Sequence, residues 1–153
     1  NNFLNKVRNL ATKKNIVLVF DECTSGFRES FGGLHLKYKV YPDMCILGKA
    51  LGNGFPITAV LGKRNIMENA QSSFISSTFW TERSGPVAAL ACLKEMERLR
   101  SWEKINNIGR YIKKNLKRIA IKYNLKIEFS GYDALIKFNF YVHKNIKKYI
   151  LKI

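Results

Sequence analysis

The chain has 153 residues, of which 27 are Lys or Arg and 11 are Asp or Glu, so its formal net charge is +16. With 46% hydrophobic and 12% aromatic residues it can bury a core, which excludes a disordered chain. No apolar run approaches the ~20 residues of a membrane-spanning helix, and the first residues lack both an initiator Met and the apolar stretch of a signal peptide. Three scattered cysteines exclude a disulfide framework, so we expect a soluble, cytoplasmic protein.

The positive charge is concentrated in the second part of the chain. Residues 1–93 carry 11 basic and 6 acidic side chains, whereas residues 94–153 carry 16 and 5. An excess of this size can mark a nucleic-acid-binding protein. The basic residues are mostly lysines in helical or terminal stretches without a recognition motif, so a solvated lysine-rich face is the favoured interpretation.

The first hundred residues alternate between helical and strand patterns. Residues 3–13 have the apolar spacing of an amphipathic helix. Residues 16–20 form a continuous apolar run, which is typical of a strand covered on both faces in a parallel sheet. Two more strands are predicted at residues 44–47 and 57–62, followed by a short helix at residues 63–69.

The rest of the chain predicts a long helix and a pair of strands. Helical spacing runs from Pro86, which suits a first turn, to about Lys122, with a break near Ser101. Residues 126–129 and 134–141 alternate like antiparallel strands. This order predicts an α/β layer followed by a smaller α+β lobe. Because strands this apolar need more neighbours than the chain supplies, we expect part of the fold to lie outside it.

Two residues at the ends of predicted strands are candidates for chemistry. Asp21 ends the first strand, at the sheet edge where ligands bind in α/β proteins. Lys49 follows the second strand in a glycine-rich loop, where its amine could act as a nucleophile. Alone, each is as well explained as a turn acid or an exposed lysine. Together, a carboxylate for a pyridine nitrogen and an amine for an aldehyde predict a pyridoxal phosphate site.

Several separated motifs resemble those of one enzyme family. Residues 20–28 read FDECTSGFR and residues 42–57 read PDMCILGKALGNGFPI. Both closely resemble the signature of the class III pyridoxal-phosphate-dependent aminotransferases, and the first is most similar to the glutamate-1-semialdehyde aminomutase branch. STFW at residues 77–80 and GPVAA at residues 85–89 resemble the next landmark of the family.

The resemblance implies a role for four residues. Lys49 would hold pyridoxal 5'-phosphate through a Schiff base and later shuttle a proton between substrate and cofactor. Asp21 would pair with the pyridine nitrogen, and Cys23 would pack against one face of the ring. Thr78 would reach the cofactor phosphate of the neighbouring subunit, which implies a homodimer. Glu22 is interpreted as a structural residue of the signature.

The resemblance also implies the fold and the domain organisation. We expect part of a fold type I transferase, with a fragment of the large-domain sheet and a partial C-terminal α+β lobe. Residues 1–95 would belong to the cofactor-binding large domain and residues 96–153 to the small domain. No metal site is expected, because His35 and His143 are isolated in the sequence.

The implied function is amino group transfer between a small-molecule amino donor and a carbonyl acceptor, by an aminotransferase or an aminomutase. Family members are more than twice as long, so we expect a fragment that lacks the upstream phosphate cradle. An alternative from another class is a truncated or decayed paralogue without activity, which at most binds a partner. A third hypothesis, a small nucleic-acid binder, rests on charge alone, and nothing points to a membrane.

Overall fold

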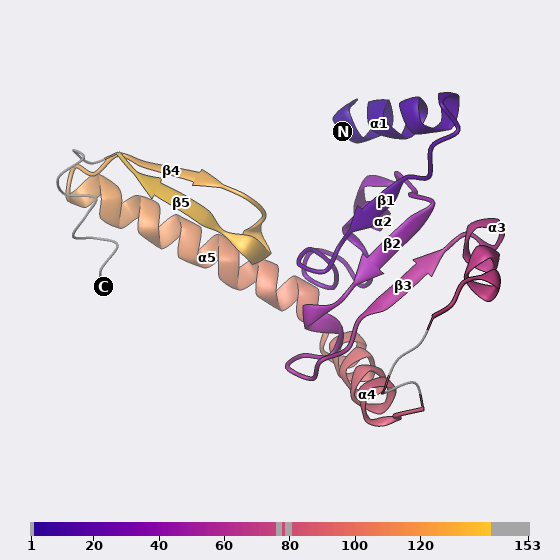
Figure 1. The fold of residues 1–153 in the computed structure, drawn as a ribbon. Coiled ribbons are helices and arrows are strands. Elements are labelled where there is room, and N and C mark those ends of the chain that lie inside the picture. The colour runs from indigo at the N-terminus through magenta and orange to yellow at the C-terminus, as the bar shows by residue number, and fades with distance from the viewer. Residues whose placement is uncertain (1, 76–77, 79–80, 142–153) are drawn as a thin grey trace. The chain divides into compact units, whose positions relative to one another are not determined.

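A computed structural model describes residues 2–75, 78 and 81–141 and divides the chain into two compact units, Asn1–Trp102 and Glu103–Ile153. Each unit is described by itself (Figure 1). Across the described ranges, none of the helices combines the length and the apolar character that a membrane crossing requires.

The first unit carries one three-stranded sheet with helices around it. In chain order its elements are α1 (Asn2–Lys13), β1 (Val19–Asp21), α2 (Leu34–Tyr38), β2 (Met44–Leu47), η1 (Lys49–Leu51), β3 (Ala59–Gly62), α3 (Arg64–Met67), η2 (Glu68–Ser72) and α4 (Ser84–Leu99). The η elements are short 3₁₀ helices. The predicted α/β order of this part is confirmed.

The sheet has the order β1-β2-β3, with β2 in the middle. β1 runs parallel to β2, with Asp21 opposite Ile46, whereas β3 runs antiparallel to β2. The antiparallel return fits the short connection through residues 48–58, because a parallel return needs a crossover of a dozen or more residues.

The first strand is shorter than its apolar run predicts. Ile16 instead closes the turn after α1, because its backbone N–H donates to the carbonyl of Ala11 at 2.8 Å. Ile16, Val17 and Val19 are 58%, 47% and 43% exposed, so the expectation of a strand covered on both faces is wrong for this unit. β1 is also an edge strand, with β2 on one side and no strand on the other among the described residues.

The core of the first unit lies between the sheet and α4. Its buried members are Phe27, Cys45, Leu47, Leu51 and Ala89. Cys45 is thus a packing side chain of this core. α4 carries Pro86 in its first turn, as predicted, and ends at Leu99, because the next residue, Arg100, has a φ of 48° that breaks the helical path.

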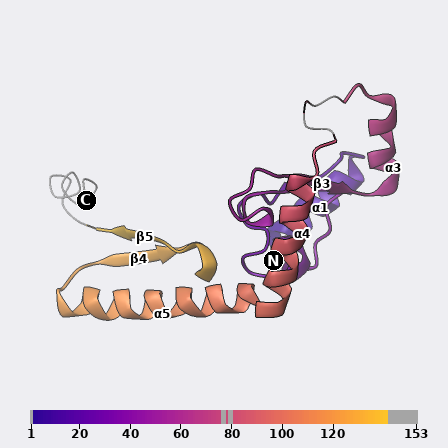
Figure 2. The same ribbon diagram turned by 90° about the horizontal axis from the view of Figure 1, so that it is seen from below.

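The second unit is a helix with a β-hairpin along it (Figure 2). It contains most of α5 (Ser101–Lys122), β4 (Ile127–Ser130), η3 (Asp133–Leu135) and β5 (Lys137–Phe140), and the two strands pair antiparallel, as the sequence pattern predicts. Asp133 lies between β4 and β5 and binds this connection to α5. Its carboxylate accepts hydrogen bonds from Lys113 at 2.7 Å and from Arg110 at 3.3 Å. The carbonyl of Asp133 packs so closely on Gly109 that a Cβ there would collide with it.

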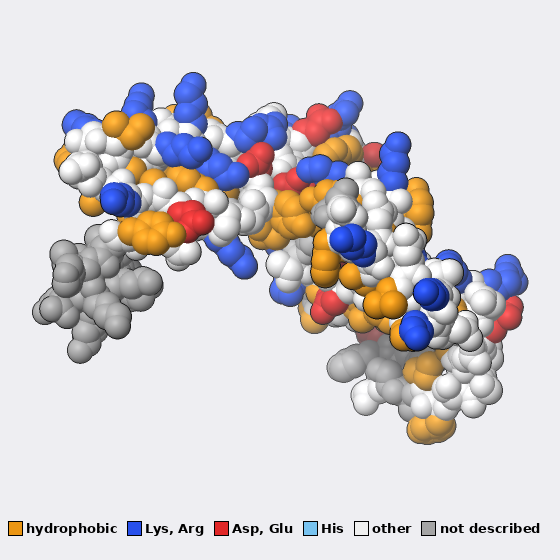
Figure 3. Space-filling model, turned by 90° about the horizontal axis from the view of Figure 1, so that it is seen from above, with side chains coloured by type: hydrophobic (Ala, Val, Ile, Leu, Met, Phe, Trp, Pro, Cys, Tyr) orange, Lys and Arg blue, Asp and Glu red, His pale blue; other side chains and the backbone are white. Residues whose placement is uncertain are grey.

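The positive charge does not gather in one patch on the face that Figure 3 displays. Lysine and arginine side chains are scattered over both units there, with hydrophobic side chains between them. This face therefore carries solvated cations between apolar side chains, as a lysine-rich surface is expected to.

Asp43 fixes the amino-terminal end of the sheet. Its carboxylate accepts from the backbone N–H of Leu18 at 2.8 Å, from Lys63 at 2.7 Å and from Arg8 at 2.8 Å. These contacts join β2 to α1, to the start of β1 and to the end of β3. They hold the pKa of the Asp43 carboxyl well below its ordinary value, first through the Leu18 N–H and then through the two cations.

We expect Asp43→Asn to lower the free energy of unfolding by about 2 kcal/mol at neutral pH, because it weakens charge-assisted bonds at a buried site. Since the folded-state pKa is depressed, the contribution is present above about pH 4 and is lost as the pH falls below that value. Urea titrations from pH 6 to pH 3 should therefore show a smaller loss of stability in the variant than in the wild type.

Glu68→Gln is the control for Asp43→Asn, because it removes an exposed acid that lies 3.9 Å from the guanidinium of Arg64. Its effect should stay within about 0.5 kcal/mol. An Asp43→Asn variant with wild-type pH dependence would contradict the assignment of Asp43 as the anchor of this sheet end.

Candidate functional site

The parallel pairing of β1 and β2 places the predicted acid and the predicted lysine at the same sheet edge. Asp21 is the last residue of β1 and lies opposite Ile46, and the Glu22 N–H donates to the Ile46 carbonyl at 2.8 Å. Lys49 comes three residues after Ile46, just beyond the end of β2. Both side chains therefore stand at the carboxyl ends of parallel strands, where α/β proteins bind ligands.

Asp21 is an exposed carboxylate held by the turn that follows it. Its Oδ1 accepts from the backbone N–H of Cys23 at 3.0 Å. This bond, followed by one from the Cys23 thiol and by the charge of Lys49, lowers the pKa of Asp21 below its ordinary value. Asp21 is thus ionised at neutral pH, and its carboxylate can accept a hydrogen bond from a ligand.

Close packing explains why small residues surround Lys49. A Cβ at Gly48 would lie 3.3 Å from both the Cys23 Sγ and a methyl group of Thr58, and a Cβ at Gly52 would collide with the carbonyl of Phe55. Asn53 has a φ of 45°, in the left-handed region that asparagine tolerates, as expected for its place in the glycine-rich loop.

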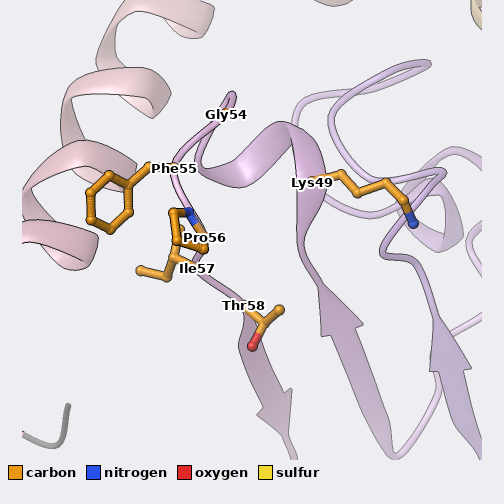
Figure 4. A pocket seen from close by; sticks show the side chains of 6 residues that line it. All are labelled: Lys49, Gly54, Phe55, Pro56, Ile57 and Thr58. Atoms are coloured by element: carbon orange, nitrogen blue, oxygen red, sulfur yellow. The ribbon is translucent and has the colours of Figure 1, made fainter.

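The side chain of Lys49 extends across the end of β2 toward the loop after β1, away from Phe55 and Pro56 (Figure 4). Its Nζ donates to the Thr24 hydroxyl oxygen at 2.8 Å. Lys49 also borders an open hollow of about 430 Å³, whose other lining residues are Gly54, Phe55, Pro56, Ile57 and Thr58. The site therefore combines an exposed amine, a nearby carboxylate and an open hollow lined by both polar and apolar groups.

Cys23 and Thr78, the other two predicted site residues, lie in different surroundings. Cys23 is half-buried beside Gly48, and burial together with the neighbouring Asp21 raises the pKa of its thiol. It is therefore a neutral, weakly polar side chain at neutral pH, which suits a packing role. Thr78 is exposed in a turn before α4 and does not line the hollow beside Lys49. Its predicted role toward a neighbouring subunit stays a prediction.

Thr24 was not among the predicted site residues. It lies three residues after Asp21, in a loop with several hydroxyl groups. The loop has no periodic pattern, so nothing in the sequence tells which hydroxyl reaches Lys49. Only the folded turn identifies Thr24 as the acceptor.

Glu22 is buried beside the site and caps α2. Its carboxylate accepts the backbone N–H groups of Leu34 and His35 and the Ser25 hydroxyl, and the His35 Nδ1 lies 2.6 Å from it. The sequence suggested that His35 is isolated, but in the structure it has close neighbours. The atoms of Glu22, His35 and Cys45 that could bind a metal ion lie within 4.8 Å of one another.

Four donors surround the two carboxylate oxygens of Glu22, which makes it a hydrogen-bonded cap of α2. This placement agrees with the structural role expected for Glu22. His143, the other histidine considered for a metal, lies outside the described residues.

Comparison with known proteins identifies relatives over nearly the whole chain. The family model for class III aminotransferases matches residues 1–153. A 3-aminobutyryl-CoA aminotransferase of Cloacimonas acidaminovorans is 35% identical over 130 residues, which cover 84% of this chain and 31% of that protein. A glutamate-1-semialdehyde 2,1-aminomutase of Lachnoclostridium phytofermentans is 34% identical over 137 residues, covering 87% and 32%. The chain thus spans about a third of the length of these relatives.

Solved structures agree on the fold. The FumI protein of a Sphingopyxis species, described as its internal aldimine form with pyridoxal phosphate, superposes with a TM-score of 0.86 at 23% identity. The match covers 90% of this chain and 33% of that one. The described residues therefore form part of the α/β fold of pyridoxal-phosphate-dependent transaminases, as expected from the sequence.

We expect Glu22→Gln to lower the free energy of unfolding by about 2 kcal/mol or more, because glutamine replaces one fully used acceptor oxygen with an N–H₂ donor facing other donors. The neighbouring Asp21→Asn is a matched control. Asp21 is exposed, and the asparagine oxygen still accepts from Cys23, so its effect should stay within about 0.5 kcal/mol. Urea unfolding followed by circular dichroism distinguishes the two, and equal losses would contradict the cap assignment.

Proposed function

The chain belongs to the class III aminotransferase family, and on that premise we propose that it is the part of an amino-transferring enzyme that holds pyridoxal phosphate through Lys49 and Asp21. The observation that carries the proposal is the joint position of these residues at one sheet edge, close enough for the Lys49 charge to lower the pKa of Asp21. Residues 1–95 would belong to the large domain and residues 96–153 to the small domain.

The residues present fit this cofactor. Bound pyridoxal phosphate supplies an aldehyde that reacts with an amine and a protonated pyridine ring that accepts electrons. Asp21, exposed and ionised, would hold the proton on the ring nitrogen, since a carboxylate beside it favours the charged form. Lys49, exposed beside the hollow, would hold the cofactor at its Nζ atom.

The same lysine would move the proton of the reaction. Once its Nζ atom is free, Lys49 would take the proton from the reacting carbon of the amino donor and pass it to the bound cofactor, and the reverse transfer would deliver a proton to the carbon of the acceptor. Cys23, neutral because its thiol pKa is raised, would pack against one face of the ring. Thr78 would reach the phosphate bound in a neighbouring subunit, so we propose a homodimer.

The substrates would be a small-molecule amino donor and a carbonyl acceptor. The relatives include both an aminotransferase and an aminomutase, and both reactions use the same lysine and aspartate. We place the protein in the cytoplasm, because its three cysteines are free thiols, which suits a reducing compartment.

The test is capture of the cofactor by the purified chain. We expect pyridoxal phosphate to produce an absorbance band that borohydride removes, and peptide mapping to place the reduced adduct on Lys49. Lys49→Ala should abolish both signals, whereas Lys94→Ala, which removes an exposed lysine of α4, should keep them. Asp21→Asn should weaken capture about tenfold, as expected for the loss of one charge-assisted hydrogen bond.

Adduct scattered over surface lysines, with equal signals in Lys49→Ala and wild type, would contradict the proposal for this chain. That result would favour the alternative of a fragment without catalytic activity, an alternative motivated by the chain spanning only about a third of its relatives.

A further inference from the structure

We propose that Thr24 is the positioning residue for the Lys49 amine. The Thr24 hydroxyl oxygen accepts from Lys49 Nζ at 2.8 Å, across 25 residues of sequence. This inference rests on the proposed function of Lys49, but the contact itself needs no cofactor. Thr24 would act through Lys49 and is therefore a positioning residue, not a catalytic one.

The turn that carries Thr24 is firmly held. Within residues 22–28, the Gly26 N–H donates to the Glu22 carbonyl at 2.8 Å, and the Arg28 Nε donates to the Thr24 carbonyl at 2.7 Å. A Cβ at Gly26 would lie 2.8 Å from a methyl group of Leu47, so the turn packs directly on the core. The hydroxyl of Thr24 therefore stands on a rigid support.

The backbone of Lys49 is also held. Its carbonyl accepts the Asn53 N–H at 3.0 Å and the Gly52 N–H at 3.2 Å, and its φ of 43° is fixed by the tight turn of η1. With both backbones held, one hydrogen bond at the tip is enough to select an orientation of the long lysine side chain. A group that reacts with a fixed amine gains from this preorganisation.

The chemistry of the acceptor suits a lysine that must later be released. Asp21 is near enough for its pKa to respond to Lys49, but its Oδ1 is engaged by the Cys23 N–H. The hydroxyl of Thr24 is neutral, so it can hold the ammonium without neutralising the carboxylate. A bond between an exposed ammonium and a hydroxyl is also weak enough to break when the amine reacts.

The first test uses the cofactor-free chain and trace acetylation of its lysines by acetic anhydride. Thr24→Val keeps the branched shape but removes the acceptor, whereas Thr24→Ser keeps the hydroxyl. We expect Thr24→Val to raise acetylation of Lys49 relative to Lys94 about fivefold, as for loss of one modest hydrogen bond. Thr24→Ser should stay within about twofold of wild type. Equal acetylation in all three proteins would overturn the contact.

The second test uses limiting pyridoxal phosphate and borohydride. In wild type and Thr24→Ser the reduced adduct should map mainly to Lys49, whereas in Thr24→Val the share on Lys49 should fall at least twofold, because the amine is no longer presented beside Asp21. An unchanged share in Thr24→Val would overturn the positioning role. Circular dichroism checks that the variants fold, which the exposed position of Thr24 favours.

The two tests separate this inference from the proposed function. Acetylation that responds to Thr24→Val, with no adduct at Lys49 in any protein, would support the contact and reject the cofactor assignment. An adduct at Lys49 together with unresponsive acetylation would support the cofactor assignment and reject the role of Thr24.

Discussion

The parallel register between β1 and β2 is the constraint on which the candidate site depends. Only three residue pairs, Val19–Met44 to Asp21–Ile46, define it. Asp43 anchors one end by binding the N–H of Leu18, and the Glu22 N–H extends the pairing at the other end. Because side chains alternate in a strand, a shift of one residue would turn Asp21 to the opposite face and away from Lys49. The short register is therefore supported by side-chain anchors at both ends.

Asp21 and Glu22 show how this alternation gives two neighbouring acids different environments. Asp21 stays exposed at the sheet edge, where its charge remains available to a ligand. Glu22 points into the interior and uses its carboxylate to hold α2 and the loop before it. Burial of an unpaired carboxylate would be costly, and the four donors around Glu22 remove that cost. Glu22 therefore stabilises the local structure that holds Asp21 at the sheet edge.

The sequence predicted the parts of the fold that depend on local pattern. The helix at residues 3–13, the strand at residues 44–47 and the break near Ser101 all appear in the structure, because apolar spacing and backbone chemistry determine them. The five-residue helix α2 was not predicted, since its cap, Glu22, lies twelve residues before Leu34.

The predictions that missed depended on contacts between distant residues. Residues 16–20 read as one strand, but the bond from Ile16 to Ala11 places the start of that run in the turn after α1. For the site, the motif predicted Asp21 and Lys49, and the structure places both at the carboxyl ends of neighbouring parallel strands. The contact with Thr24 depends on how one turn folds against η1, and no spacing in the sequence expresses that arrangement.

Position, not charge, distinguishes Lys49 in a chain with 27 Lys and Arg residues. Several cations among the described residues have acids as partners, as Lys63 has Asp43 and Lys113 has Asp133. Lys49 instead donates to a neutral hydroxyl, while its charge still acts on Asp21. An ammonium in a direct ion pair must lose that pair before it can react, and the carboxylate is then left unpaired as well. The arrangement at this sheet edge keeps amine and carboxylate near each other without joining them, as the proposed function of the two residues requires.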